Sequence, residues 1–134
     1  MCKGGEMEIG EVSTASIDSR PLWNRTGIRL QAGQQYQLGA CGEWIDKEYK
    51  CGPSGYPSPK LFMKWLEWLR RAPKQNWFAL MGALDCDEKN LFYIGDSLTF
   101  APGRSGELTC FANDLRATYF NNHGSVQLTV KRLR

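Results

Sequence analysis

The side chains best suited to chemistry stand close together between residues 113 and 124. This segment holds one carboxylate, on Asp114, and two adjacent amides, on Asn121 and Asn122. Calcium prefers about six to eight oxygen ligands, drawn from carboxylates, amides, backbone carbonyls and water. His123 is the one soft donor nearby. The segment therefore predicts a site for a hard cation, with Ca²⁺ as the cofactor.

An ordinary turn is the alternative interpretation of the same residues. The run Asn121-Asn122-His123-Gly124 is also typical of a hairpin turn, because Asn and Gly tolerate a positive φ. The spacing does not match an EF-hand loop, which needs acidic or amide residues at alternate positions and a distal Glu. A zinc site is disfavoured too, because no two cysteines are spaced C-x-x-C and the chain has one histidine.

Composition narrows the classes of protein further. The five cysteines are odd in number and follow no apolar leader, which predicts mostly free thiols in a reducing compartment. We expect a cytoplasmic protein, with non-classical export left open, and we expect Cys41 and Cys110 to be small buried hydrophobes in strands. Whether Cys41 pairs with Cys51 is left open. The net charge of +3 gives no support for a nucleic-acid partner, and no apolar stretch is long enough for a membrane span.

The elements that must position the segment are predicted to be strands. The 134 residues suggest a single domain spanning 1–134. Strict alternation of apolar and polar residues predicts a strand over 125–133, and similar patterns over 28–30 and 36–40 predict a hairpin around the turn at 31–34. About eight short strands separated by turns favour an all-β fold, a β-sandwich or jelly roll. Residues 42–59 show no periodicity and are expected to form a long loop.

One stretch has a different period. Over residues 60–71, apolar residues recur at helical spacing, which predicts one inserted amphipathic helix ended by Pro73. Charged residues, among them Arg70 and Arg71, fall on its polar side. We expect the face with Trp65 and Trp68 to cover a sheet or close one end of the fold; the alternative is an aromatic surface for a partner or a sugar ring.

The segment also carries a family resemblance. The pattern Asn113-Asp114-x-x-x-Thr118-Tyr119-x-Asn121-Asn122-x-Gly124-Ser125 resembles the calcium and sugar loop of the PA-I type galactophilic bacterial lectins. Shorter motifs along the chain are also similar to that family, and nearly the whole chain is covered apart from the stretch near 60–71. They are Gly10-Glu11-Val12, the spacing from Gly33 to Gly42, Gly52-Pro53-x-Gly55, Ile94-Gly95-x-Ser97 and Gly106-x-Leu108-Thr109.

The resemblance implies a galactose-binding-like jelly roll that holds one calcium per chain. The implied metal ligands are the backbone carbonyls of Asp46 and Thr118, the carboxylate of Asp114 and the side-chain oxygens of Asn121 and Asn122. Two neighbouring hydroxyls of a sugar would fill the remaining positions. The implied sugar contacts are Asp46, Asp114, Leu115 and Asn121. The family also leaves a homo-oligomer open.

The chain departs from these lectins in two places. Their His and Gln, which contact the exocyclic hydroxyl of the sugar, have no match in residues 56–62, so the identity of the sugar is not fixed. At the first carbonyl position, Asp46 replaces an aromatic residue. If the side chain of Asp46 also turned toward the metal, the site would bind calcium more tightly.

Three functions are weighed on this basis. We expect a calcium-dependent carbohydrate-binding protein that takes galactose or a related sugar and is not an enzyme. The alternative is a metal-free β-sandwich interaction module that uses the inserted Trp-rich helix. A hydrolase with a carboxylate pair is disfavoured, because acidic residues in loops are usually solvated and a single histidine offers little general-base chemistry. The acidic residues considered are Glu43, Asp46, Glu48, Asp85 and Asp87.

Overall fold

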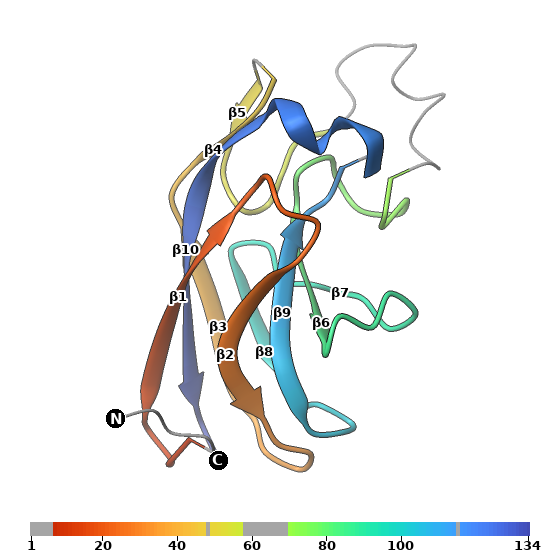
Figure 1. The fold of residues 1–134 in the computed structure, drawn as a ribbon. Helices are drawn as coiled ribbons and strands as arrows, with labels where there is room; N and C mark the ends of the chain where they lie inside the picture. Colours follow the sequence, from red (N-terminus) through yellow and green to blue (C-terminus); the bar gives the residue numbers. More distant parts are fainter. Residues whose placement is uncertain (1–6, 48, 58–69, 115) are drawn as a thin grey trace.

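The computed structural model describes residues 7–47, 49–57, 70–114 and 116–134. These residues form two antiparallel sheets that lie face to face, as the sequence predicts (Figure 1). The described strands are β1 (Val12–Asp18), β2 (Asn24–Leu30), β3 (Tyr36–Cys41), β4 (Trp44–Asp46), β5 (Tyr49–Cys51), β6 (Leu80–Leu84), β7 (Phe92–Tyr93), β8 (Ser97–Phe100), β9 (Gly106–Ala112) and β10 (Asn122–Arg132). A 3₁₀ helix, η2 (Arg116–Asn121), joins β9 to β10.

Strand β10 is the centre of the six-stranded sheet, whose order is β5-β4-β10-β3-β8 with β1 also paired to β10. Val126, Leu128 and Val130 are fully buried while the residues between them are exposed, so the predicted alternation of this strand is confirmed. Strands β3 and β4 follow one another along β10. The chain bends between them at Gly42, whose φ of 108° favours glycine.

The four-stranded sheet has the order β2-β9-β6-β7. Every residue of β6 is buried, and all but one residue of β9 are buried as well. Gly82 in β6 leaves the space that the ring of Phe92 fills, because a Cβ at this position would lie 2.7 Å from that ring. The second sheet therefore packs on both faces, which explains why the run from Trp77 to Leu84 shows no alternation.

The predicted hairpin of residues 28–40 is wrong. Strand β2 pairs with β9 in one sheet, whereas β3 pairs with β10 and β8 in the other, so the turn at 31–34 carries the chain between sheets. Alternation identifies a strand but does not identify its partner. The long loop expected over 42–59 is also interrupted, because β4 and β5 form a pair of three-residue strands there.

The core lies between the two sheets. Trp44 is its largest fully buried side chain, and its indole Nε1 donates a hydrogen bond of 3.1 Å to the backbone oxygen of Phe78. Burial of apolar surface on this scale is the main favourable term in folding. Other core members are Ile17, Leu30, Tyr36, Leu38, Leu80, Leu108, Cys110 and Leu128.

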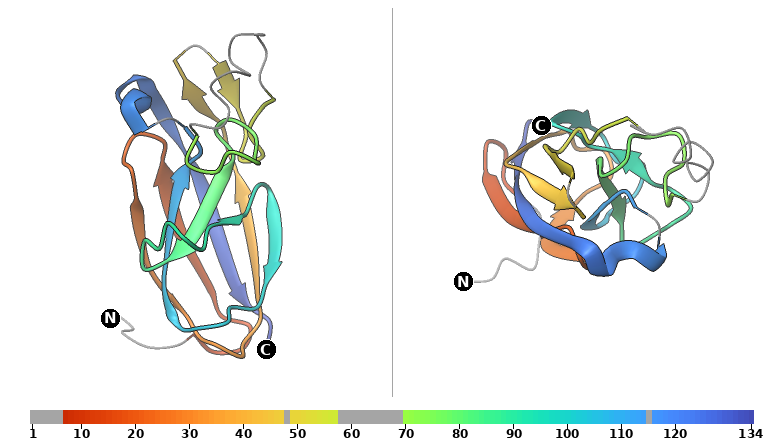
Figure 2. Two further views of the ribbon diagram at one scale, coloured as in Figure 1. Left: turned by 90° about the vertical axis from the view of Figure 1, so that its right-hand side faces the viewer. Right: turned by 90° about the horizontal axis from the view of Figure 1, so that it is seen from above.

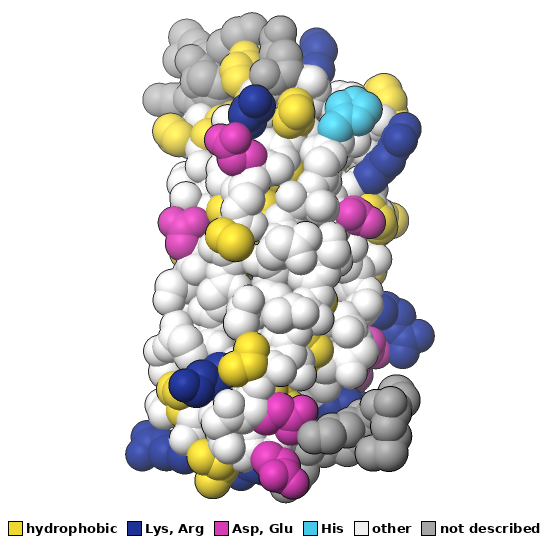
Figure 3. Space-filling view, turned by 90° about the vertical axis from the view of Figure 1, so that its left-hand side faces the viewer, with side chains coloured by type: hydrophobic (Ala, Val, Ile, Leu, Met, Phe, Trp, Pro, Cys, Tyr) yellow, Lys and Arg dark blue, Asp and Glu magenta, His cyan; other side chains and the backbone are white. Residues whose placement is uncertain are grey.

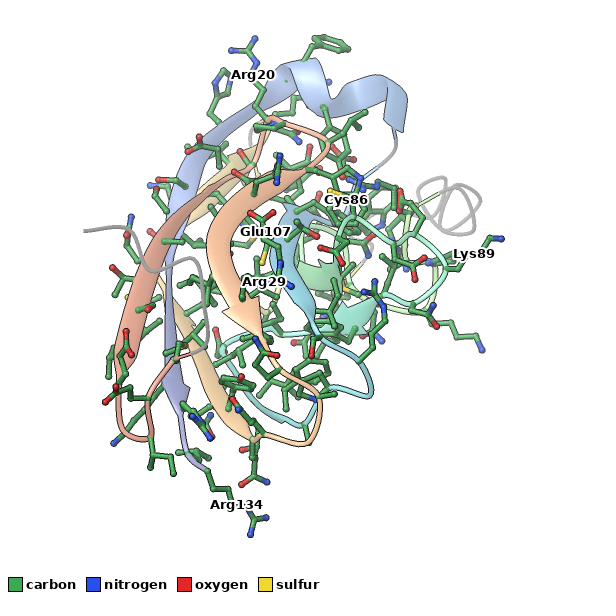
Figure 4. All side chains as sticks on the ribbon, turned by 60° about the horizontal axis from the view of Figure 1, so that its bottom comes forward. Arg20, Arg29, Cys86, Lys89, Glu107 and Arg134 are labelled. Carbon is green, nitrogen blue, oxygen red and sulfur yellow. The ribbon has the colours of Figure 1, made fainter. Side chains whose placement is uncertain are left out.

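The outer faces of the two sheets differ in charge. Over the middle of the six-stranded sheet, the exposed side chains are mostly uncharged, and charged groups gather toward its ends and edges (Figure 3). On the four-stranded sheet, Arg29 and Glu107 are register partners on β2 and β9 (Figure 4). There Arg25 pairs with Glu107 at 2.8 Å, and Arg104 pairs with Asp85 at 2.9 Å.

The predictions for the cysteines are confirmed in part. Cys110 is buried in β9, as expected, but Cys41 is exposed because its position in β3 points away from the core. Cys41, Cys51, Cys86 and Cys110 are all free thiols. Burial raises the pKa of the Cys51 thiol to about 12.

Residues 60–69 of the expected helix lie outside the described residues. Arg70 and Arg71, placed on its polar side by the sequence, lie instead in a bend, where Arg70 and the side chain of Arg71 are buried. The guanidinium of Arg71 lies 3.5 Å from the ring centre of Phe111 and 4.7 Å from that of Trp23, and it pairs with Glu88 at 3.0 Å. A planar cation can be buried when aromatic rings and a carboxylate surround it. Among the described residues, none forms a helix with the length and apolarity to span a membrane.

Candidate functional site

The predicted segment crosses from one sheet to the other at the end of the molecule that carries β4 and β5. Strand β9 ends at Ala112 in the four-stranded sheet, and η2 then leads into β10 in the six-stranded sheet (Figure 2). Asp46, at the end of β4, is the register partner of Asn122. Residues from both sheets therefore meet at this end, with the C-terminus at the other (Figure 1).

Asn113 fixes the start of the segment and is fully used in doing so. Its Nδ2 donates hydrogen bonds of 2.9 Å to the backbone oxygens of Ala72 and Asn76, and its Oδ1 accepts one of 2.9 Å from the Ala72 amide. Its backbone oxygen accepts a bond of 2.6 Å from the Phe78 amide. Asn113 is therefore a structural residue that sets the position of Asp114, the next residue in the chain.

The two amide oxygens at the end of the segment are in an unusual state. Oδ1 of Asn121 and Oδ1 of Asn122 are both buried, and neither accepts a hydrogen bond from any described residue. The amide of Asn122 is held in place, because its Nδ2 donates a bond of 2.9 Å to the backbone oxygen of Ser19. A buried acceptor without a donor costs about 1–3 kcal/mol. Two such oxygens on successive residues are suitable ligand atoms for a hard cation.

Two carboxylates are buried at the same end of the fold. Asp114 is 2% exposed and Asp46 is 8% exposed. Burial raises the pKa of Asp46 above its ordinary value, while a hydrogen bond from the Tyr56 hydroxyl and the charge of Lys47 act in the opposite direction. Asp46 and Asn122 lie directly opposite each other on antiparallel strands, so their side chains share one face of the sheet. A buried carboxylate is costly unless a cation or hydrogen-bond donors compensate its charge.

The remaining predicted residues are placed less fully. Thr118 lies within η2, between Asp114 and Asn121 along the chain, and Leu115 lies outside the described residues. The structure thus brings Asp46, Asn121 and Asn122 to one end of the fold, where Asp114 follows β9. Their roles as metal and sugar ligands stay predictions. Among the described residues, no group of three or more His, Cys, Asp or Glu is gathered for a metal, so a cation would need amide and backbone oxygens in addition to carboxylates.

Tyr56 is a member of this site that the sequence did not predict. Its hydroxyl donates a hydrogen bond of 2.6 Å to Oδ2 of Asp46, and its ring stacks on Tyr49 with centres 5.4 Å apart. A β-bridge to Trp77 holds its backbone. The signal was the Gly-Pro-x-Gly motif before it: Gly55 has a φ of 76°, and a Cβ there would lie 2.3 Å from the backbone oxygen of Trp77.

A surface hollow opens beside the first residues of β10. Its volume is about 550 Å³, and its lining includes Arg20, Asn122 and His123. Arg20 is anchored at its rim, because its Nη2 donates a hydrogen bond of 3.1 Å to the backbone oxygen of Phe120 (Figure 4). Small-molecule sites usually occupy about 300–1,000 Å³. The hollow therefore has the volume of a small-molecule site, next to the strand that carries one of the orphaned oxygens.

Comparisons with known proteins bear on the fold. No family model matches the chain, and no curated protein matches it. A solved structure described as "EclA N-terminal domain; PllA-like lectin" is similar, with a TM-score of 0.67 and 18% sequence identity over 89% of this chain and 94% of that one. At this identity the similarity shows the fold: the chain shares the sandwich of a lectin domain. Membership of the PA-I type family stays a prediction.

Proposed function

We propose that this chain is a calcium-dependent carbohydrate-binding protein and that it catalyses no reaction. One observation carries the proposal: the buried, orphaned Oδ1 atoms of Asn121 and Asn122. These atoms belong to the segment whose residue types predict a hard cation. The proposal is supported further by the shared fold with a lectin domain.

The proposed ligands are the carboxylate of Asp114, the amide oxygens of Asn121 and Asn122, and the backbone carbonyls of Asp46 and Thr118. A bound calcium ion would offer its remaining coordination positions to two neighbouring hydroxyl groups of a sugar. The chain's part is to hold the oxygens ready. The hydrogen bonds of Asn113 hold the chain just before Asp114, and the backbone oxygen of Ser19 holds the amide of Asn122. Few side chains therefore have to be ordered when the ligand binds.

Galactose or a closely related sugar is the proposed ligand class, on the basis of the PA-I type resemblance. The proposed sugar contacts are Asp46, Asp114, Leu115 and Asn121. Tyr56 lies in the region where those lectins carry their His and Gln, and its hydroxyl is engaged with Asp46. We therefore expect the exocyclic hydroxyl of the sugar to be recognised differently from the family pattern.

The test compares thermal unfolding in excess calcium with unfolding in a chelator. At a calcium concentration of about 100 times the Kd, binding to the folded state alone adds about 2.7 kcal/mol. For a chain of this length that is a rise in Tm of roughly 10 °C. Asp114→Asn should abolish the rise. The matched control is Asp87→Asn. The hydrogen bonds described for the carboxylate of Asp87 all come from its own turn, from Asn90 and Lys89.

A wild-type chain whose Tm does not change with calcium would overturn the proposed calcium site. A glycan array tests carbohydrate binding separately. The protein is expected to be retained on galactose-bearing glycans in calcium but not in chelator. Retention without turnover distinguishes a lectin from a glycosidase. The metal-free module built on the Trp-rich helix stays a prediction, because residues 60–69 lie outside the described residues; binding of a protein partner that calcium does not affect would favour it.

A further inference from the structure

The contact between Tyr56 and Asp46 joins two groups that the resemblance does not connect. The Tyr56 hydroxyl lies 2.6 Å from Oδ2 of Asp46, and both residues are held rigidly. Asp46 is fixed by its pairing with Asn122 on one side and Tyr49 on the other. Tyr56 is fixed by two backbone hydrogen bonds with Trp77, of 2.9 and 3.0 Å, and by its stack on Tyr49.

The side chain of Asp46 is directed inward. In β4, Trp44 and Asp46 are buried while Ile45 between them is only half-buried, so Asp46 shares the inner face with Trp44, a member of the core. Asn122, its register partner on β10, is also buried. Burial and the hydrogen bond to Asp46 raise the pKa of Tyr56, and the charge of Asp114 adds to the rise. The carboxylates of Asp46 and Asp114, from opposite sheets, therefore both act on the hydroxyl of Tyr56.

We propose that the Asp46 carboxylate is itself a calcium ligand and that Tyr56 is the positioning residue that aims it. This inference rests on the proposed function and extends it, because the resemblance assigns only the backbone carbonyl of Asp46 to the metal. The hydroxyl of Tyr56 occupies Oδ2, which fixes the rotation of the carboxylate. Outer partners that orient a ligand in this way typically affect metal affinity by about 10–100-fold.

A second carboxylate also changes the character of the site. A cation held by Asp114 alone would keep one positive charge uncompensated, whereas Asp114 and Asp46 together match the charge of Ca²⁺. The affinity for calcium should then be set mainly by the protein, and a sugar would bind to a site already loaded. Divalent ions of similar size should bind without sugar present.

The experiment measures calcium affinity by calorimetry on the full chain, without sugar. Tyr56→Phe removes one hydroxyl and should weaken calcium binding by about 10–100-fold. Asp46→Asn should weaken it at least as much. In the double variant Tyr56→Phe should cause no further loss, because the hydroxyl acts only through the carboxylate. Tyr49→Phe is the matched control, since Tyr49 stacks on the same ring, and its affinity should stay within twofold of wild type.

Circular dichroism and melting in chelator establish that each variant is folded. Wild-type affinity in both Asp46→Asn and Tyr56→Phe, with loss of binding in Asp114→Asn, would overturn this inference and leave the proposed function intact. Equal losses from Tyr56→Phe in the presence and absence of Asp46→Asn would also overturn it, since the effect would then be structural. A wild-type chain that binds no calcium would overturn both proposals.

Discussion

Asp46 and Asn122 face each other across the pairing of β4 with β10, at the point where the chain returns from the four-stranded sheet. One polar atom of each side chain is fixed by a neighbour: Tyr56 donates to Oδ2 of Asp46, and Nδ2 of Asn122 donates to Ser19. The pair therefore has a defined orientation before any ligand arrives. Because the pair lies where the two sheets meet, ligand binding at the pair would depend on the packing of both sheets.

Asn121 offers the sharpest separation of stability from binding. Its Oδ1 is buried and accepts no hydrogen bond from the described part of the chain, so removing it should not harm the calcium-free fold. We expect Asn121→Ala to melt in chelator at or above the wild-type Tm and to lose most of the rise that calcium gives. Paired thermal melts in chelator and in calcium measure both effects. A large loss of stability in chelator would show that the oxygen has a structural partner after all.

Asn113→Ala should have the opposite effect on the calcium-free fold. The side chain of Asn113 makes hydrogen bonds with Ala72, Gln75 and Asn76 in a fully buried position. Asn113→Ala should lower the free energy of unfolding by about 2–4 kcal/mol, because several buried backbone groups lose their partners. Urea unfolding measures the loss. Because the hydrogen bonds of Asn113 hold the chain just before Asp114, the calcium affinity of the folded fraction should fall as well. An unchanged affinity would contradict this positioning role.

Gly55 and Gly27 form a matched pair for testing the close approach beneath Tyr56. Both have a positive φ, of 76° and 74°, but a Cβ at Gly55 would clash with the backbone of Trp77 and Ala79, whereas nothing lies within 4 Å at Gly27. Gly27→Ala should cost about 1–2 kcal/mol, the cost of the backbone conformation alone. Gly55→Ala should cost clearly more and should also weaken calcium binding by displacing Tyr56. If Gly55→Ala and Gly27→Ala lowered the free energy of unfolding in urea equally, the close approach of Gly55 to Trp77 and Ala79 would have no effect on stability, contrary to this prediction.

Asp85 provides a prediction for the pH dependence of stability. Hydrogen bonds from the Arg104 guanidinium and from the Glu107 amide hold its pKa below its ordinary value of 3.8. A lowered pKa in the folded state means that the carboxylate stabilises the fold above pH 3.8 and that this contribution is lost as the pH falls through the folded value. Asp85→Asn should therefore be less stable than wild type at pH 7, and the difference should shrink toward pH 3. Because Asp85 is largely exposed, the effect should be small. Urea midpoints from pH 7 to 3 test it, and a difference that grows on acidification would reverse the assignment.

The sequence predicts some parts of this molecule well for identifiable reasons. The strand at 125–133 is found because Val126, Leu128 and Val130 face the core in strict alternation. Asp114, Asn121 and Asn122 can be singled out from the sequence because they belong to one segment of the chain, and their roles as ligands stay predictions. Each of these features is local, and local patterns are what a single sequence displays.

The features that the sequence missed depend on distant contacts. The pairing of β2 with β9 rather than β3 is decided by the whole sandwich, and strands as short as β4 and β5 have too few residues to show a period. Arg71 looks like a solvated charge until Trp23, Phe111 and Glu88 are placed around it. Tyr56 comes from an aperiodic loop, and its importance arises only from the fold that brings it to Asp46.

The termini give the molecule a built-in direction. The backbone oxygen of Met7 accepts a hydrogen bond from Arg132, and that of Arg134 accepts one from Gln35, so both ends of the described chain are secured beside the turn between β2 and β3. A fusion partner or a surface anchor attached at either end would thus project away from the Asn121 and Asn122 rim. Copies tethered through either end would present that rim outward, and under the proposed function several copies could then bind one carbohydrate-bearing surface together.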